Sequence, residues 1–238
     1  MKPVLVLQHQ PNDGPAYLAT WLQRQGLPME LWRADVGAPP PGSVAGYAGL
    51  AVLGGAMSVN DDLDHLRREE ALIREAMQAG TPVIGHCLGG QLMARSLGAR
   101  VHESPAPEIG WNELEVVPGE ASRHWFGPGL SHRVMHWHYE AFELPAGATL
   151  LARSPSCANQ AFCIGPHLGM QFHVEADERK IDLWSREVSA EWESACARHP
   201  HSVQSGAAMR EQSAWHLAGQ RSLADHLYGV WAAGLAGR

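Results

Sequence analysis

Cys87 lies between two glycines at the junction of an apolar run and a helical stretch. Gly85 and Gly89 flank it in a G-x-C-x-G pattern, after apolar residues 82–85 and before a helical stretch at 88–97. Strand, pattern and helix together are typical of a nucleophile elbow, a tight turn that exposes one side chain above a sheet. A helix start also favours the thiolate over the thiol. A lone cysteine more often only packs, but glycines at these offsets favour a nucleophile at Cys87.

A second motif could supply the base that a cysteine nucleophile needs. His173 and Glu175 form an H-x-E pattern at the end of another apolar run, residues 168–172. In a strand, residues two apart project from the same face, so both side chains are expected to point the same way. The imidazole would take the thiol proton and the carboxylate would hold its tautomer. Alone, such a pair could be idle at a strand end; with the elbow it predicts a Cys-His-Glu triad.

The remaining histidines and cysteines carry weaker signals. His136 and His138 have the i, i+2 spacing of a chelating pair on a strand, but the sequence offers no third ligand at convincing spacing. We therefore predict no bound metal. Cys157, Cys163 and Cys196 lack a nearby base or a glycine-rich turn, and we expect them to be packing residues.

Short apolar runs alternate with helical stretches over the first hundred residues. This alternation predicts a mostly parallel sheet with right-handed crossovers, flanked by helices. The expected strands are residues 4–8, 29–32, 50–53 and 82–85, and the expected helices are 16–25, 63–79 and 88–97.

From residue 99 to residue 173 the pattern changes to short runs between glycine and proline turns. Runs at 114–117, 134–138, 161–164 and 168–172 predict antiparallel or mixed additions to the sheet. Two helices are expected at 181–198 and 209–233. We predict an α/β domain over 1–198 and a helical extension over 199–238 that packs on the same domain.

The composition argues against several other classes of protein. The chain has 238 residues, 45% of them hydrophobic, and a formal net charge of -7. A mildly acidic chain without a basic run is a poor candidate for nucleic-acid binding. No window approaches the roughly 18 apolar residues of a membrane span, and the first apolar run is too short for a signal peptide. We predict no nucleic-acid or membrane partner and a cytoplasmic location.

The two motifs together resemble those of class I (triad-type) glutamine amidotransferases. Residues 85–91 read GHCLGGQ and residues 171–175 read QFHVE. Within the family the chain resembles stand-alone members that are similar to the amidotransferase domain of GMP synthase. The resemblance implies a flavodoxin-like fold, with Cys87 as nucleophile, His173 as general base and Glu175 as the orienting acid.

The resemblance also implies a set of residues around the substrate. Backbone NH groups of Gly55 and Leu88 would hold the oxyanion, and Gln91 would help to hold the substrate glutamine. Residues 136–140 resemble the segment whose backbone grips the amino-acid end of glutamine, and residues 108–111 resemble another recurring stretch near the site. The implied substrate and oxyanion residues are Gly55, Leu88, Gln91, Trp137, His138 and Tyr139.

Three positions depart from the family pattern. His86 stands where a small or apolar residue is more usual, Gly90 where relatives often have His or Tyr, and Val174 where H-P-E has proline. None of these changes removes a reacting atom. His86 is the one expected to alter the surroundings of the thiol.

These residues lead us to expect hydrolysis of the side-chain amide of glutamine, without metal or cofactor. The chain has no nucleotide-binding P-loop and no room for a synthetase domain, so ammonia would pass to a separate synthase. A γ-glutamyl peptide hydrolase with the same triad is the alternative. A non-catalytic binding protein is less favoured because every reacting residue is present. An esterase is weaker still, since its acid normally lies many residues before the histidine.

Overall fold

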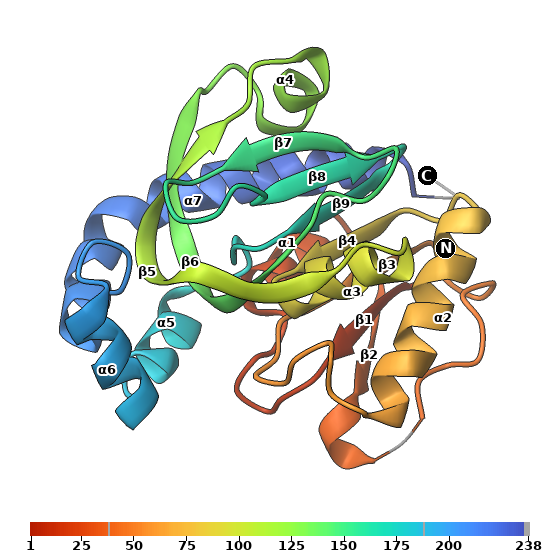
Figure 1. The fold of residues 1–238 in the computed structure, drawn as a ribbon. Helices are drawn as coiled ribbons and strands as arrows, with labels where there is room; N and C mark the ends of the chain where they lie inside the picture. Colours follow the sequence, from red (N-terminus) through yellow and green to blue (C-terminus); the bar gives the residue numbers. More distant parts are fainter. Residues whose placement is uncertain (38, 188, 236–238) are drawn as a thin grey trace.

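The computed structural model consists of one nine-stranded sheet between layers of helices (Figure 1). It describes residues 1–37, 39–187 and 189–235. The strand order is β2-β1-β3-β4-β9-β8-β7-β5-β6. The strands are β1 Val4–Gln8, β2 Met29–Arg33, β3 Gly49–Val52, β4 Val83–His86, β5 Val101–Val116, β6 Ser131–Phe142, β7 Thr149–Arg153, β8 Ala161–Ile164 and β9 His167–Met170. The helices are α1 Ala16–Arg24, α2 Asp64–Gln78, α3 Leu88–Ser96, α4 Glu120–Phe126, α5 Glu178–Trp184, α6 Ala190–Arg198 and α7 Gly206–Ala233, with a short 3-10 turn, η1, at Ala34–Val36.

The first half of the sheet is parallel, as the alternation of elements predicted. Strands β2, β1, β3, β4 and β9 pair in parallel. β1, β3 and β4 are buried along their whole length, which explains their continuous apolar runs. Val4 and Val6 pack with α1 and α7 on one face, whereas Leu5 and Leu7 pack with α2 and α3 on the other. Helices therefore cover both faces of the parallel half of the sheet.

The antiparallel additions are present, but they are longer than the sequence indicated. Short runs at 114–117 and 134–138 proved to be parts of β5 and β6, which pair over most of their length. Pro105 and Pro107 lie in β5, where a proline cannot donate to a ladder, and the register shifts between Glu103 and Glu108. Because prolines are unusual inside paired strands, the sequence pattern did not predict the first part of β5. β7 and α4 were not predicted.

Two predicted elements are wrong in ways that affect the site. β9 ends at Met170, so the H-x-E pair lies in the turn after the strand and not on its face. The helix expected at 181–198 is two helices, α5 and α6. Asp177 caps α5 and Ser189 caps α6, each accepting a hydrogen bond from a backbone NH three residues on. These caps start separate helices, which apolar periodicity alone did not separate.

The last helix, α7, packs on the same core as the sheet. Leu227, Tyr228 and Trp231 are fully buried and belong to the cluster that contains β1 and α1. The division of the chain at residue 198 stays a prediction. Among the described residues, no helix combines the length and the apolar character that a membrane crossing needs.

Candidate active site

Cys87 occupies a strained turn between β4 and α3. Its φ of 49° and ψ of -108° lie outside the regions that side-chain-bearing residues usually adopt. The backbone NH of Cys87 donates to Met170 O over 2.8 Å, which ties the turn to the end of β9. A Cβ on Gly85 would stand 2.5 Å from the carbonyl carbon of Gly89. The flanking glycines are therefore required for the turn to close, as the elbow pattern predicts.

His173 and Glu175 meet although they are not on a strand. Nδ1 of His173 lies 2.7 Å from Oε1 of Glu175, and both side chains are buried. Burial disfavours both charges, but the mutual attraction and further contacts outweigh it, so the pKa of Glu175 is well below its ordinary value and that of His173 is raised. The neighbouring Cys87 side chain adds to this rise in the pKa of His173. Cys87, His173 and Glu175 thus form one connected group.

A pocket of about 560 Å³ opens over this group. Its volume is in the range of small-molecule sites. Of the predicted substrate and oxyanion residues, all but Leu88 line it; Leu88 instead begins α3, directly after Cys87. Glu175 lies behind His173 and does not reach the pocket wall. The pocket residues predicted from the sequence are Gly55, Cys87, Gln91, Trp137, His138, Tyr139 and His173.

Comparisons with known proteins identify the family. The family model described as glutamine amidotransferase class-I matches residues 18–183. The chain belongs to the class I glutamine amidotransferases. It is 32% identical over 203 residues to a putative glutamine amidotransferase-like protein, YfeJ, from Salmonella typhimurium, covering 79% of this chain and 83% of that protein.

Two further relatives place this amidotransferase within the family. One subunit of a glutamine-hydrolysing GMP synthase from Thermoplasma acidophilum is 30% identical over 159 residues, covering 65% of this chain and 74% of that protein. A crystal structure of a glutamine amidotransferase from Methylobacillus flagellatus superposes with a TM-score of 0.90 at 33% identity, covering 99% of this chain and 96% of the other. The α/β fold with a mostly parallel sheet is thereby confirmed as the class I fold.

The pocket of this amidotransferase is acidic. Asp13, Glu140, Glu187 and Glu191 contribute carboxylates to its wall. Among the lining residues that the structure describes, none is a lysine or an arginine. Such a wall attracts an ammonium group and repels phosphate or additional carboxylate groups.

The sequence analysis missed the residues that surround Glu175. Lys180 of α5 is buried, and its ammonium donates to Glu175 Oε1 over 3.0 Å and to Gly14 O over 3.0 Å. It also forms an ion pair with Asp13. The ring of Trp184 packs edge-on against His173 with centroids 4.8 Å apart. A lysine among apolar residues of a buried helix face was the available signal.

His86 does not approach the thiol from the pocket side. It is fully buried below the elbow, with Nε2 3.1 Å from Tyr228 Oη and 3.9 Å from Glu175 Oε2. Burial lowers the pKa of His86 to about 4, so the ring is neutral near neutral pH. His86, which departs from the family pattern, therefore contacts the surroundings of Glu175 and not the pocket side of the thiol.

His136 and His138 acquire a neighbouring donor group that the sequence spacing did not indicate. Donor atoms of Glu108, His136 and His138 lie within 4.8 Å of one another, and all three residues are buried. Glu108 pairs with His138 across β5 and β6. Its Oε2 already accepts hydrogen bonds from Ser154 Oγ at 2.9 Å and Gln160 Nε2 at 2.5 Å. The absence of a metal stays a prediction.

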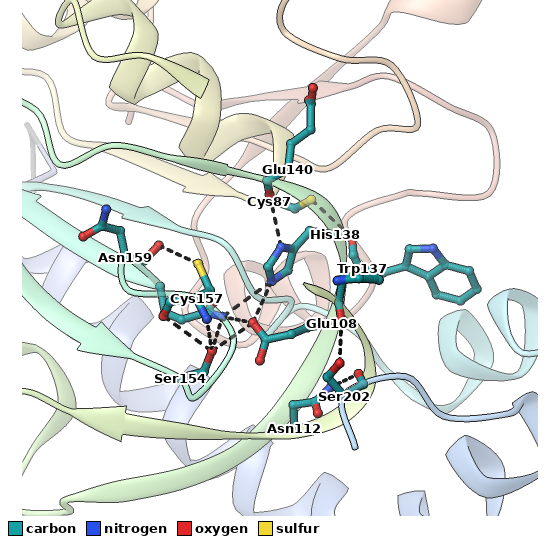
Figure 2. A network of polar contacts seen from close by, with 12 residues as sticks. Cys87, Glu108, Asn112, Trp137, His138, Glu140, Ser154, Cys157, Asn159 and Ser202 are labelled. Carbon is teal, nitrogen blue, oxygen red and sulfur yellow. Dashed lines mark hydrogen bonds and ion pairs between the residues drawn. The ribbon is translucent and has the colours of Figure 1, made fainter. Parts of the chain in front are cut away.

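The network around Glu108 anchors the strand beside the pocket (Figure 2). His138 Nε2 lies 3.3 Å from Glu108 Oε2, and its Nδ1 lies 3.1 Å from Glu140 O. Gln91 Nε2 donates to the same Glu140 carbonyl over 3.1 Å. Trp137 O accepts a weak bond from the Cys87 thiol at 3.5 Å. β6 is therefore held in one position against both Gln91 and Cys87.

The buried neutral histidines make the fold sensitive to acid. Burial lowers the pKa of His86 and His167 to about 4 and that of His136 to about 3. Histidines of the unfolded chain protonate near pH ~6.5. As the pH falls from there towards 4, the unfolded state binds protons that the folded state does not, so the free energy of unfolding decreases. We expect a loss of at least about 2 kcal/mol between pH 6.5 and 4.5 in urea titrations, from ~1.4 kcal/mol per pKa unit.

Replacing His136 by leucine tests this origin of the acid sensitivity. Neither ring nitrogen of His136 has a hydrogen-bond partner among the described residues, so the variant loses no bond. The raised pKa of His173 works in the opposite direction, but it changes stability only above pH ~6.5. We expect a shallower pH dependence in His136→Leu. An unchanged dependence would contradict the assignment to this residue.

Proposed function

We propose that the chain hydrolyses the side-chain amide of glutamine to glutamate and ammonia through a γ-glutamyl thioester on Cys87. The observation that carries this proposal is the strained Cys87 turn, joined to the His173–Glu175 pair at the base of a pocket. Membership of the class I amidotransferases supports glutamine as the substrate. No cofactor or metal takes part in the proposed reaction.

The proposed reaction has two stages. The Cys87 thiolate attacks the amide carbon, and the backbone NH groups of Gly55 and Leu88 stabilise the resulting oxyanion. His173 carries the proton taken from the thiol and gives it to the leaving nitrogen, so that ammonia departs and the thioester remains. His173 then takes a proton from water, the hydroxide adds to the thioester carbon, and glutamate leaves as the thiol is regenerated. Glu175 holds the imidazole in position throughout.

We propose that the ammonia is used by a separate synthase. A relative with 74% of its length covered is named as one subunit of a glutamine-hydrolysing GMP synthase. That name applies to the relative, and the acceptor of the present chain is defined only as a partner protein. A cytoplasmic location is part of the proposal, supported by four cysteines that are all free.

The pocket supports one alternative substrate class. It extends past Cys87 to Glu187 and Glu191, which leaves room for a leaving group larger than ammonia. A γ-glutamyl peptide hydrolase would use the same thioester and release an amine. Turnover of γ-glutamyl peptides without a partner, faster than turnover of glutamine, would decide for this alternative.

Labelling with a glutamine-shaped diazoketone tests the proposal. The purified protein is incubated with the reagent, with and without excess glutamine, and the adduct is mapped by mass spectrometry. We expect alkylation of Cys87 alone, blocked by glutamine. Equal labelling of Cys157, Cys163 and Cys196, or no labelling, would contradict it and favour the peptide hydrolase or a non-catalytic protein.

A further inference from the structure

We propose that Lys180 is a positioning residue: its buried ammonium neutralises Glu175 and Asp13 together, and so keeps Glu175 available to His173. The inference rests on the proposed function, because it concerns how the same thiol is activated. Lys180 itself does not line the pocket. It would act on the reaction through the residues that it contacts, above all Glu175.

The Lys180 ammonium has three close partners. It donates hydrogen bonds to Glu175 Oε1 and Gly14 O, each over 3.0 Å, and forms an ion pair with the carboxylate of Asp13. Its side chain is only 3% exposed. The ammonium also lies over the ring of Trp184, 4.9 Å from the centroid. A buried ammonium is costly unless it is fully paired, so these partners define one position for Lys180.

The two carboxylates that Lys180 joins are close to each other and to the imidazole. Donor atoms of Asp13, His173 and Glu175 lie within 4.8 Å of one another. Asp13 and Glu175 are 4% and 0% exposed. Two buried carboxylates at this separation disfavour each other's ionisation unless a cation lies between them. Lys180 is that cation, and it therefore allows both to remain ionised beside His173.

Other titratable groups surround this chain of charges and do not replace Lys180. On the side of Glu175, burial keeps His86 neutral by lowering its pKa to about 4, and raises the pKa of Tyr228. On the side of His173, burial lowers the pKa of His136 to about 3. Beside Asp13, His9 is paired with Glu69 at 2.8 Å. The remaining group is the Cys87 thiol, which contributes to the raised pKa of His173.

Lys180→Met provides the first test. Without the ammonium, Glu175 and Asp13 are expected to share a proton, which weakens the partner of His173 and hence the thiolate. We expect the rate of Cys87 alkylation by iodoacetamide at pH 7 to fall at least about tenfold, the effect of one pKa unit, with a changed pH profile between pH 5 and 9. A smaller fall would overturn the proposal.

A double variant separates charge from packing. In Asp13→Asn/Lys180→Met the second carboxylate is gone, so no shared proton is required. We expect its alkylation rate to be at least threefold above that of Lys180→Met. A smaller recovery would mean that Lys180 acts through packing, and would overturn the charge argument. Lys2→Met, at an exposed lysine, is the matched control and should alkylate as the parent protein does.

A third test uses the parent protein and so does not depend on whether the variants fold. The sequence has two lysines, Lys2 and Lys180, so ¹³Cε-lysine labelling yields two resolvable NMR signals. We expect the Lys180 signal to stay at its charged position up to pH 9, and a shift towards the neutral position below pH 8 would overturn the proposal. Alkylation and NMR require neither glutamine nor a partner. A failure of glutamine hydrolysis would therefore be distinguishable from a failure of this inference.

Discussion

Replacing Cys87 by serine is expected to lower glutamine hydrolysis by at least about 10⁴-fold, since removal of a nucleophile from a triad has effects of this size or larger. A hydroxyl is far less acidic than a thiol, so serine at this position would be a much poorer nucleophile. The measurement is release of glutamate from glutamine by the purified protein, with the cognate partner if one is required.

Cys196→Ser is the matched control for this substitution. Cys196 is partly exposed in α6, where its thiol approaches Gln204 O at 3.6 Å, and it does not line the pocket. We expect its activity to stay within about twofold of the parent protein, as for most surface changes. If Cys87→Ser kept more than about a hundredth of the activity, the thioester mechanism would be wrong.

Gly89→Ala is expected to destabilise the protein by more than about 4 kcal/mol or to prevent folding. A Cβ at this position would stand 2.1 Å from the backbone oxygen of Val52, in the neighbouring strand β3. Backbone cannot rotate away as a flexible side chain can, so α3 would have to move off the sheet and take the Cys87 turn with it. Urea unfolding followed by circular dichroism measures the effect.

Gly219→Ala is the control for Gly89→Ala. Gly219 lies in the exposed part of α7, and a Cβ there meets nothing within 4 Å. Alanine should stabilise the helix by about 0.5–1 kcal/mol because it restricts the unfolded chain. A Gly89→Ala protein as stable as the parent would show that α3 can adjust, contrary to the close packing described above.

The parallel half of the fold could be predicted because its signals are local. β1, β3 and β4 are buried on both faces, so their sequences are continuous apolar runs that end at glycine or a polar turn. β5 could not be predicted in the same way. Its burial follows no regular alternation, since residues 102–107 are exposed or partly exposed and residues 108–112 are buried, and Pro105 and Pro107 interrupt its sequence pattern. Pairing with β6 over a long register stabilises it nonetheless.

The H-x-E motif predicted that His173 and Glu175 would meet, which they do, but the predicted geometry was wrong. His173 and Glu175 were expected on one strand face, but the strand ends at Met170. A turn brings their side chains together instead, and Tyr17 donates its backbone NH to Glu175 O at 2.9 Å to hold that turn. Residue spacing constrained which groups could meet, and contacts with α1 determined how.

The sequence by itself determined the tight turn at Cys87. Gly85, Cys87 and Gly89 are close in the chain, and only glycines leave space for the backbone there, so composition and spacing were sufficient to predict the turn. Tertiary structure alone decided what surrounds Glu175. Lys180 is near Glu175 in the sequence, but its other partners are Asp13 and Gly14, and Gly14 is 166 residues away. Contacts over such a separation leave no local signal in the sequence. Whether a lysine is solvated or buried against two carboxylates depends on how helices and strands pack. The proposed effect of Lys180 on the Cys87 thiol depends on the same packing.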